Sequence, residues 1–234
     1  MTEPVFMLKQ HWYLISIAFI GIFFGILAGI FFSLIHDLPQ INSLKQFKPS
    51  SVTTVFSSDN KILAKFYIEK RFPVSIEKIP KNLISALITI EDKNFYIHSG
   101  INLKAIFRAI LHNIKDRSYT QGASTLTQQL AKTLFLSSEK SIARKIKEAF
   151  LTIQIERRYT KNEILELYLN LIYLGSGVYG VEAASQTYFG KSVKDLTLAE
   201  SALIAGLPKA PSVYSPIKNP DLAKKGEILS SSKC

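Results

Sequence analysis

Residues 14–35 form an apolar run, LISIAFIGIFFGILAGIFFSLI, that contains no charged side chain. At about 1.5 Å per residue, these 22 residues make a helix of about 33 Å, and the hydrocarbon core of a bilayer is about 30 Å thick. Trp12 and Tyr13 precede the run, and such aromatic side chains favour the headgroup level. We therefore expect a transmembrane helix over residues 12–36, after a short cytoplasmic tail at 1–11.

A cleaved signal peptide is the alternative for this run. Its apolar region usually has about 7 to 15 residues and precedes a cleavage site with small residues, and neither feature fits here. The charges on the two sides of the run do not decide its orientation, because Lys9 precedes it while Lys45 and Lys48 follow it closely.

The formal net charge of +11 is compatible with nucleic acid, anionic lipid or a phosphorylated substrate as partner. Residues 1–50 hold three lysines and two acidic residues, so nearly all the excess positive charge lies after the apolar run.

Composition excludes several other classes of protein. A hydrophobic content of 47% excludes disorder, and a single cysteine, Cys234, excludes intrachain disulfides. Four scattered histidines disfavour a zinc site of His and Cys.

The remainder of the chain predicts a mainly α domain with a small N-terminal β-hairpin. Residues 37–51 read as a linker, and SVTTVFSS and KILAKFYI then flank Asp59 and Asn60, which is a hairpin signal. Helical periodicity starts after Pro80, with Asn82 and Asn102 as expected N-caps. Capping boxes are predicted for three pairs: Thr125 with Gln128, Thr160 with Glu163, and Thr197 with Glu200. We expect GSGVYG (175–180) to be a loop between helices.

Glu91 and Asp92 are adjacent carboxylates at the expected C-terminus of the first helix of this domain. The helix dipole disfavours a negative charge there by about 0.3 to 1 kcal/mol, which increases the basicity of a carboxylate and suits a general base. Solvated surface is the competing interpretation of the pair. His98 is expected to support the following loop rather than to bind a metal.

The segment QGASTLTQQLAK places four polar side chains on one helical face, Thr125, Gln128, Gln129 and Lys132. Leu126, Leu130 and Leu134 form the opposite stripe. Neutral amides and hydroxyls with one lysine suit a surface that binds sugar hydroxyls and an anion, although ordinary exposure also explains a polar stripe.

The segment KSIARKIKE is predicted to bury an apolar side that includes Ile142, Ile146 and Ile153. Lys140, Arg144, Lys145 and Glu148 would then share the opposite side, with Arg144 and Glu148 at i, i+4. Two interpretations remain open here. One is a surface ion pair of little energetic value. The other is a cationic pocket for a pyrophosphate in which the glutamate orients the cations.

Five segments occur in this order: EDKNFYIHSG, QGASTLTQQLAK, ARKIKE, KNEILELYLNLIYLGSGVYGVEAASQTYFGK and LTLAESALIAGLPKAPSVYSP. On these segments the chain resembles the family 51 peptidoglycan glycosyltransferases, over roughly residues 52–217. This family forms the polymerising domain of class A penicillin-binding proteins and of monofunctional transglycosylases. The resemblance implies a lysozyme-like helical domain, held by a single N-terminal anchor on the outer face of the bacterial cytoplasmic membrane.

The implied reaction is an inverting polymerisation of lipid II, in which the acceptor 4-hydroxyl displaces undecaprenyl pyrophosphate from the growing glycan chain. Glu91 corresponds to the general base and Glu148 to the second glutamate, on the donor side. The resemblance implies no certain cofactor, but it allows Mg²⁺ or Mn²⁺ at the pyrophosphate. The implied partners are lipid II, the nascent glycan, membrane lipid and other cell-wall synthesis proteins. The residues expected to bind substrate are Ser124, Thr125, Gln128, Gln129, Lys132, Lys140, Arg144 and Lys145.

Two features depart from the family pattern. Lys140 stands where an arginine is usual, which keeps the charge and loses bidentate phosphate binding. Residues 218–234 read as a truncated tail without a transpeptidase domain, and no Ser-x-x-Lys acylation motif occurs.

Two other functions compete with polymerisation. A lysozyme-like lytic enzyme would also use one glutamate beside a glycan groove, but it would have no diphosphate for the cationic segment to neutralise. An inactive, membrane-tethered scaffold would bind lipid II or a cell-wall protein without turning it over. Nucleic-acid binding is not expected, because the basic residues follow a membrane anchor and no nucleic-acid motif occurs.

Overall fold

In the computed structural model of the chain, the structure describes residues 3–36, 38, 53–66, 71–115, 123–137, 139, 141–217 and 219. Most of the expected linker 37–51 and of the expected tail 218–234 lies outside these ranges, and so does Lys140. The described chain is mainly helical and begins with one long apolar helix, which confirms the predicted fold class in its main features.

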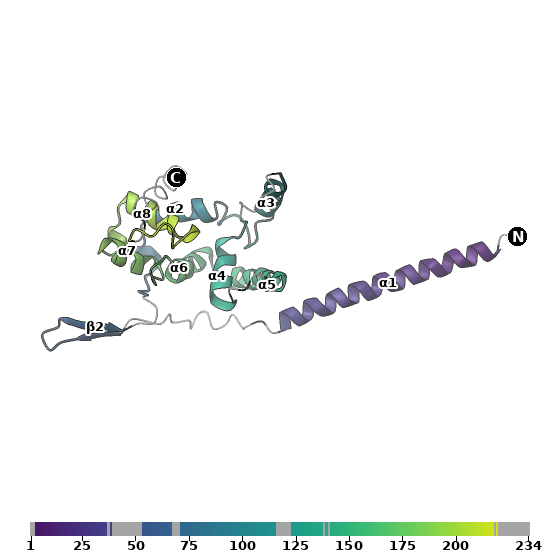
Figure 1. The fold of residues 1–234 in the computed structure, drawn as a ribbon, viewed down its shortest axis with the longest axis horizontal. Coiled ribbons are helices and arrows are strands. Elements are labelled where there is room, and N and C mark those ends of the chain that lie inside the picture. The colour runs from purple at the N-terminus through teal and green to yellow at the C-terminus, as the bar shows by residue number, and fades with distance from the viewer. Residues whose placement is uncertain are drawn as a thin grey trace.

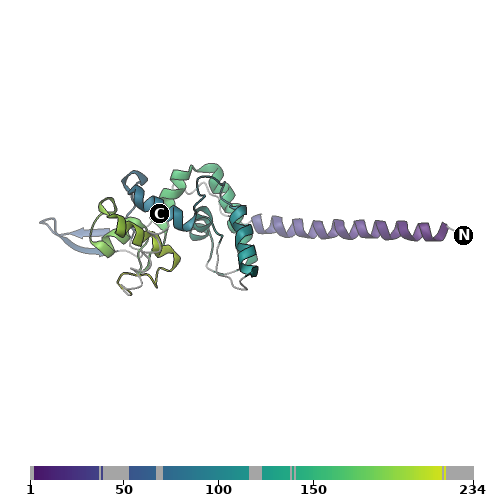
Figure 2. The same cartoon turned by 90° about the horizontal axis from the view of Figure 1, so that it is seen from above.

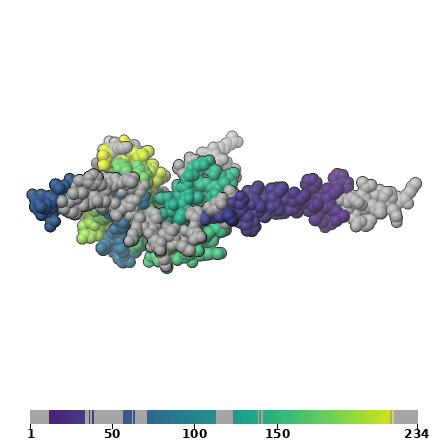
Figure 3. All heavy atoms as spheres, turned by 90° about the horizontal axis from the view of Figure 1, so that it is seen from below, coloured from purple at the N-terminus to yellow at the C-terminus, as the bar shows by residue number. Residues whose placement is uncertain are grey.

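Helix α1 (Glu3–His36) contains the predicted membrane span. Its apolar window, Trp12–Ser33, has a mean hydropathy of 2.6 and no share of it is buried by the rest of the protein. Figures 1 and 3 show α1 extending away from the helical domain, with its C-terminal end next to α5 (Ile142–Arg158), which it contacts. By length and composition, α1 is therefore able to cross a bilayer.

A two-stranded antiparallel sheet follows, formed by β1 (Thr53–Phe56) and β2 (Ile62–Phe66). The register pairs Thr53 with Phe66 and is interrupted by a bulge between Val55 and Phe56. Asn60 adopts a positive φ of 59° in the connecting turn, a conformation that asparagine tolerates better than most residues. This sheet projects from the helical domain on the side away from α1 (Figure 1).

The helical domain packs around a core in which α2 lies against α8, and α4 lies against α5 and α6. Fully buried leucines and isoleucines, such as Leu87, Leu130 and Ile155, fill this core. The elements are η2 (Ile76–Lys78), α2 (Lys81–Glu91), α3 (Leu103–Lys115), α4 (Leu126–Phe135), α5, α6 (Lys161–Leu171), α7 (Val181–Phe189), η3 (Val193–Asp195), α8 (Leu198–Gly206) and η4 (Leu207–Lys209).

Local sequence signals determine most of the helix starts. The three predicted capping boxes are all confirmed, at the N-termini of α4, α6 and α8. Asn102 caps α3 as expected, because its Oδ1 accepts from the backbone NH of Ala105 at 3.0 Å. The prediction of Asn82 as a cap was wrong. Helix α2 begins at Lys81 with Pro80 as its N-cap, two residues before the predicted one, and the carbonyl of Pro80 accepts from the backbone NH groups of Leu83 and Ile84.

Two helices carry apolar side chains that the core does not cover. On α3, Leu103, Phe107, Ile110 and Leu111 are all at least half exposed. On α5, Ile142 is 83% exposed and Ile153 is also exposed, so the expectation that their stripe is buried was wrong. The core instead receives the face of α5 that holds Glu148, Leu151 and Thr152. Tertiary packing thus overrides the apolar pattern of α5. Glu148 can be buried in place of the isoleucines because it has ion-pair partners, which are described below.

The predicted loop at 175–180 connects α6 to α7 and depends on glycine backbone conformations. Gly180 has φ 82° and ψ 156°, a region of conformational space that is essentially restricted to glycine. A Cβ atom there would lie 2.7 Å from the carbonyl oxygen of Asn170. Asn170 itself binds the backbone of Val74 through both side-chain atoms, so it cannot yield easily.

We predict that Gly180→Ala destabilises the folded domain by about 2 to 5 kcal/mol, from backbone strain and steric overlap together. Gly177→Ala is the matched control, because Gly177 also has a positive φ, of 73°, but has no atom within 4 Å of the added methyl group. The Gly177→Ala substitution should lower the free energy of unfolding by only about 1 to 2 kcal/mol. Thermal or urea unfolding in detergent measures both, and equal losses would contradict the close contact at Gly180.

Candidate active site

Glu91 ends α2 and is partly buried. Burial raises the pKa of its carboxyl above the ordinary value, and the adjacent Asp92 acts in the same direction. A hydrogen bond from Gln129 Nε2 to Glu91 Oε2, at 2.7 Å, and the charge of Lys209 lower this pKa and limit the shift. The carboxylate is therefore a stronger base than an exposed glutamate, and one that is held by a fixed partner.

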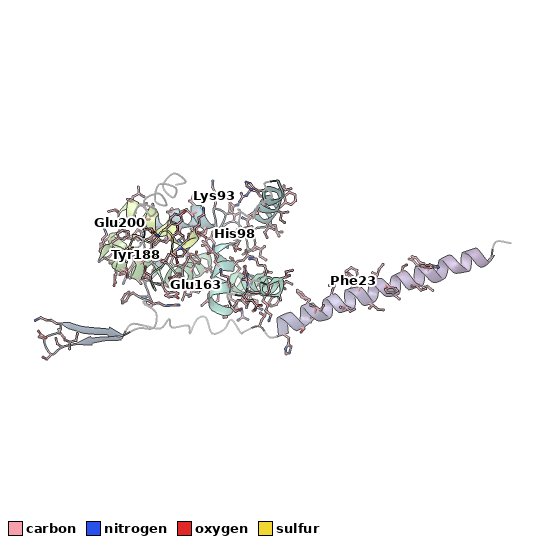
Figure 4. The ribbon with its side chains drawn as sticks, viewed as in Figure 1. Phe23, Lys93, His98, Glu163, Tyr188 and Glu200 are labelled. Atoms are coloured by element: carbon pink, nitrogen blue, oxygen red, sulfur yellow. The ribbon has the colours of Figure 1, made fainter. Side chains whose placement is uncertain are left out.

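Asp92 fixes the backbone immediately after Glu91. This buried carboxylate accepts from His98 Nε2 at 2.9 Å and from the backbone NH of Leu126 at 3.1 Å. His98 Nδ1 in turn accepts from the NH of Gly100 at 3.0 Å. The network joins the end of α2, the following loop and the start of α4, and Figure 4 labels His98 within it. His98 thus supports a loop, as expected.

Gln129 is oriented by a second contact. Its Oε1 accepts from the hydroxyl of Tyr168 at 3.0 Å, which leaves Nε2 directed at Glu91. Burial and the negative charge of Glu91 raise the pKa of Tyr168, so this hydroxyl stays protonated and remains a donor. Tyr168 therefore determines which end of the Gln129 amide faces the carboxylate.

The other polar residues expected on this face of α4 divide into two groups. Thr125 and Gln128 are buried, and they form the capping box of α4 with each other. Thr125 Oγ1 also donates to the carbonyl of Gly100 at 2.5 Å. Lys132 is exposed in the last turn of the helix. Gln129 and Lys132 therefore remain accessible for a ligand, whereas Thr125 and Gln128 hold the helix terminus.

The third predicted segment forms a charge cluster on α5 around one buried carboxylate. Glu148, which is only 2% exposed, accepts from Arg144 Nη1 at 2.9 Å and from Lys145 Nζ. Lys145 Nζ also donates to Ser124 Oγ at 3.0 Å, which connects α5 to the residues before α4. Two cations around one carboxylate leave a net positive charge. The burial of Glu148 does not fit a pair that lies wholly on the surface, and the cationic pocket for a pyrophosphate stays a prediction.

A cavity of about 570 Å³ is lined by Glu91, whereas Arg144, Lys145 and Glu148 are not among its lining residues. Its lining includes Glu91 and Asp92 from the end of α2, Arg108 from α3, and Ser124 before α4. Because Ser124 binds Lys145, the cavity that exposes Glu91 has a wall that adjoins the Arg144–Glu148–Lys145 cluster. Most of the lining side chains are polar or charged, as a sugar-binding groove requires.

Sequence reasoning missed three residues that shape this site: Asp92 as the structural anchor, Tyr168 as the orienting donor, and Lys209 as a charge near Glu91. Tyr168 lies 39 residues from Gln129 in sequence, so no local pattern relates them. Lys209 stands within the LPKAPSVYSP segment, but nothing in the spacing assigns it to Glu91.

Among the described residues, no group of three or more His, Cys, Asp or Glu side chains has the arrangement of a metal site.

Comparison with known proteins now identifies the family. The profile of the family described as "Transglycosylase" matches residues 59–231. This chain belongs to the transglycosylase family. It is 48% identical over 210 residues to penicillin-binding protein 1A of Aquifex aeolicus, and the match covers 88% of this chain and 29% of that protein. It is 51% identical over 189 residues to penicillin-binding protein 1A of Vibrio cholerae, which covers 81% of this chain and 23% of that protein.

A crystal structure of penicillin-binding protein 1A from Haemophilus influenzae also matches, with a TM-score of 0.45, 27% identity, and coverage of 80% of this chain and 18% of that one. The transglycosylase chain thus spans less than a third of the length of these penicillin-binding relatives.

We predict that Gln129→Met shifts the acid limb of the pH profile of glycosyl transfer to higher pH. The substitution removes the hydrogen bond that lowers the pKa of Glu91, so this pKa rises further and the base is lost by protonation at a higher pH. The pH dependence of kcat/KM measures the shift. Thr133→Ala is the matched control one turn along α4, where the hydroxyl donates only to the Gln129 carbonyl. An acid limb that stays at the same pH in Gln129→Met would contradict the influence of the Gln129 hydrogen bond on the pKa of Glu91.

Proposed function

We propose that this protein is a peptidoglycan glycosyltransferase that polymerises lipid II by inverting transfer from an undecaprenyl-pyrophosphate-linked donor. The observation that carries the proposal is a carboxylate with a raised pKa in a polar cavity, one lining residue of which, Ser124, binds a cationic cluster outside it. The carboxylate is that of Glu91, and the cluster is the Arg144–Glu148–Lys145 group. Membership of the transglycosylase family supports the same activity.

Glu91 is assigned as the general base. Gln129 occupies its Oε2, while Oε1 has no hydrogen-bond partner among the described residues and is available to the acceptor 4-hydroxyl. In the proposed step the hydroxyl oxygen forms a bond to the donor anomeric carbon, with inversion, and its proton passes to Glu91. The bond from that carbon to the diphosphate oxygen breaks at the same time. Such general-base assistance typically contributes about 10²- to 10⁴-fold in rate.

Arg144 and Lys145 are assigned to the leaving diphosphate. Cations that neutralise the growing charge replace the general acid that a glycosidase needs, because a diphosphate departs without being protonated to an alcohol. The buried Glu148 holds both cations in place and would otherwise be an unpaired buried charge. Ser124, Gln129 and Lys132, with Lys140 outside the described residues, are proposed to contact donor groups nearby.

The substrates are lipid-linked, so the cavity must stand beside a membrane. Helix α1 supplies an anchor, and Figures 1 and 2 show α3 and α5 at the end of the domain from which α1 extends. The exposed Leu103 and Phe107 of α3 and the exposed Ile142 of α5 would enter the bilayer interface on that side. We propose a single-pass protein of the bacterial cytoplasmic membrane with its catalytic domain on the periplasmic side.

A Mg²⁺ or Mn²⁺ ion, if one binds together with the diphosphate, would supply further positive charge to the leaving group. We also propose interaction with other cell-wall synthesis proteins, by analogy with the family. The protein's own residues supply the base and the cationic wall in either case.

We predict that the protein in detergent polymerises labelled lipid II and that Glu91→Gln lowers the rate by at least about 10²-fold without loss of the fold. Gel analysis of the labelled glycan measures the rate, and thermal unfolding checks the fold. Glu77→Gln, an exposed glutamate of η2, is the matched control and should retain full activity. Soluble muropeptides as product would indicate a lytic enzyme, and lipid II binding without turnover would indicate a scaffold.

We predict that Lys145→Ala raises the KM for the donor by about tenfold or more, because a charge-assisted contact to phosphate is lost. Lys147→Ala removes a lysine from the same helix outside the cluster and should leave the donor KM unchanged. Kinetics with separately varied donor and acceptor measure the effect. A lower unfolding temperature with an unchanged donor KM would make Lys145 a purely structural residue.

A further inference from the structure

The ion pair between Glu156 and Lys161, where α5 ends and α6 begins, is not explained by the helices that carry it. Glu156 lies in the last turn of α5 and Lys161 is the first residue of α6, with Lys161 Nζ 2.8 Å from Glu156 Oε2. A helix dipole disfavours a carboxylate near its C-terminus and a cation near its N-terminus. The two side chains are only 7% and 22% exposed. The pair therefore opposes the local electrostatics, and its other contacts account for its position.

Lys161 holds the loop that follows Glu91. Its Nζ donates to the carbonyl of His98 at 2.8 Å and lies 4.6 Å from the centroid of the buried Phe95 ring. Asp92 binds the side chain of the same histidine. His98 is thus held at two points, by a carboxylate at its ring and by an ammonium group at its carbonyl.

Glu156 holds the first turn of α4. Its Oε1 accepts from Thr127 Oγ1 at 2.6 Å, and Thr127 is fully buried. The neighbouring Leu126 donates its backbone NH to Asp92. Helix α4 packs against both α5 and α6, the helices that carry the pair (Figure 1). Asp92 and the Glu156–Lys161 pair therefore join the same two segments, the loop and the start of α4, by two separate bridges.

The loop also lies directly on α5. Gly100 has a positive φ of 92°, and a Cβ atom there would be 2.7 Å from Thr152 Cγ2 and 2.8 Å from Glu156 Cγ. Glu148, Thr152 and Glu156 stand at i, i+4 and i+8, so they share one face of α5 over about 12 Å. One end of this face carries Glu148 with its two cations, and the other end carries the loop.

We propose that Lys161 and Glu156 are positioning residues for glycosyl transfer, which hold the loop after Glu91 at a fixed position relative to the cationic cluster of α5. The inference rests on the proposed function and adds to it two residues that act through His98 and Asp92. Neither of the two is among the residues that line the cavity. The proposed step needs the base and the cations placed together around one anomeric carbon, so a displaced loop should slow the transfer and leave substrate binding intact.

The first test compares lysine variants. Lys161→Met keeps an unbranched apolar stem against the Phe95 ring and removes the charge. It should lower kcat for lipid II polymerisation by about tenfold or more, with a KM within about twofold of the wild type. Lys191→Met is the matched control and should retain the wild-type kcat, because Lys191 forms an ion pair of comparable exposure with Glu200, at 2.7 Å. Lys161→Arg keeps the cation and its donors, so its kcat should lie between those of the wild type and Lys161→Met.

The pH profile is a readout that a general loss of stability would not move. Burial is the main cause that raises the pKa of Glu91. A loosened loop admits water to this carboxylate, so its pKa falls and the acid limb of kcat/KM moves to lower pH in Lys161→Met. This direction is opposite to the one expected for Gln129→Met. The variant leaves unchanged the charged groups that line the cavity or act on the carboxylate, which are Asp92, Lys93, Arg108 and Lys209.

Hydrogen exchange tests the bridge without turnover. The backbone NH groups of Gly100 and Leu126 donate to His98 Nδ1 and to Asp92. In folded Lys161→Met both groups should exchange about tenfold faster or more, because the loop opens locally more often. The matched control should keep the wild-type exchange rates.

A milder variant carries the test should Lys161→Met fail to fold. Thr127→Val removes only the hydroxyl group that donates to Glu156 and leaves the Glu156–Lys161 pair in place. It should change kcat, the acid limb and the exchange rates in the same direction as Lys161→Met, to a smaller extent.

Three outcomes would overturn the inference. A folded Lys161→Met with the wild-type kcat would show that the pair does not position the base. A lower kcat with an unmoved acid limb and unchanged exchange rates would make the pair purely structural. A wild type that forms no polymer would overturn the proposed function together with this inference, whereas polymer from the wild type with none of these effects in the variants would overturn this inference alone.

Discussion

The buried carboxylate of Asp92 determines how the rest of the site is arranged. It accepts from His98 and from the backbone of Leu126, and so it joins two segments of chain that lie 34 residues apart. Because Asp92 directly follows Glu91, the same contacts set the end of α2 and the direction of the neighbouring carboxylate. The negative charge also lies at the N-terminus of α4, where the helix dipole favours it. The position of Glu91 is thus a consequence of how its neighbour Asp92 is packed.

Buried charges in this domain occur with defined partners. Glu148 binds Arg144 and Lys145, and Glu156 accepts from Lys161 and from Thr127. Removing one partner of such a buried ion pair typically lowers the folding stability by about 3 to 5 kcal/mol, because the remaining charge stays desolvated. Pairing fixes the cations of α5, and Lys145 also binds Ser124, which lines the cavity. The geometry for binding an anion is then prepared before the anion arrives, which is the condition for effective electrostatic stabilisation.

Much of the local structure could be predicted from the sequence. The capping boxes of α4, α6 and α8 were recognisable, since a hydroxyl and a carboxylate or amide three residues apart satisfy each other's backbone groups. The faces of α3 and α5 could not be assigned in this way. Their apolar residues follow helical spacing, which does not reveal whether a core, a bilayer or neither covers them. Ile142 is exposed because the core receives the face of α5 that holds Glu148, Leu151 and Thr152, and Phe107 is exposed on α3.

The sequence by itself determined the apolar α1, the helical domain, and the segments that contain Glu91, Gln129, Arg144 and Glu148, because caps, periodicity and residue type are local properties. Only the tertiary structure decided that Thr125 and Gln128 hold a helix terminus, that Tyr168 orients Gln129, and that Arg108 shares a cavity with Glu91. These relations depend on contacts between residues distant in the chain. Burial and shared cavities arise from how helices pack, and local spacing does not encode them.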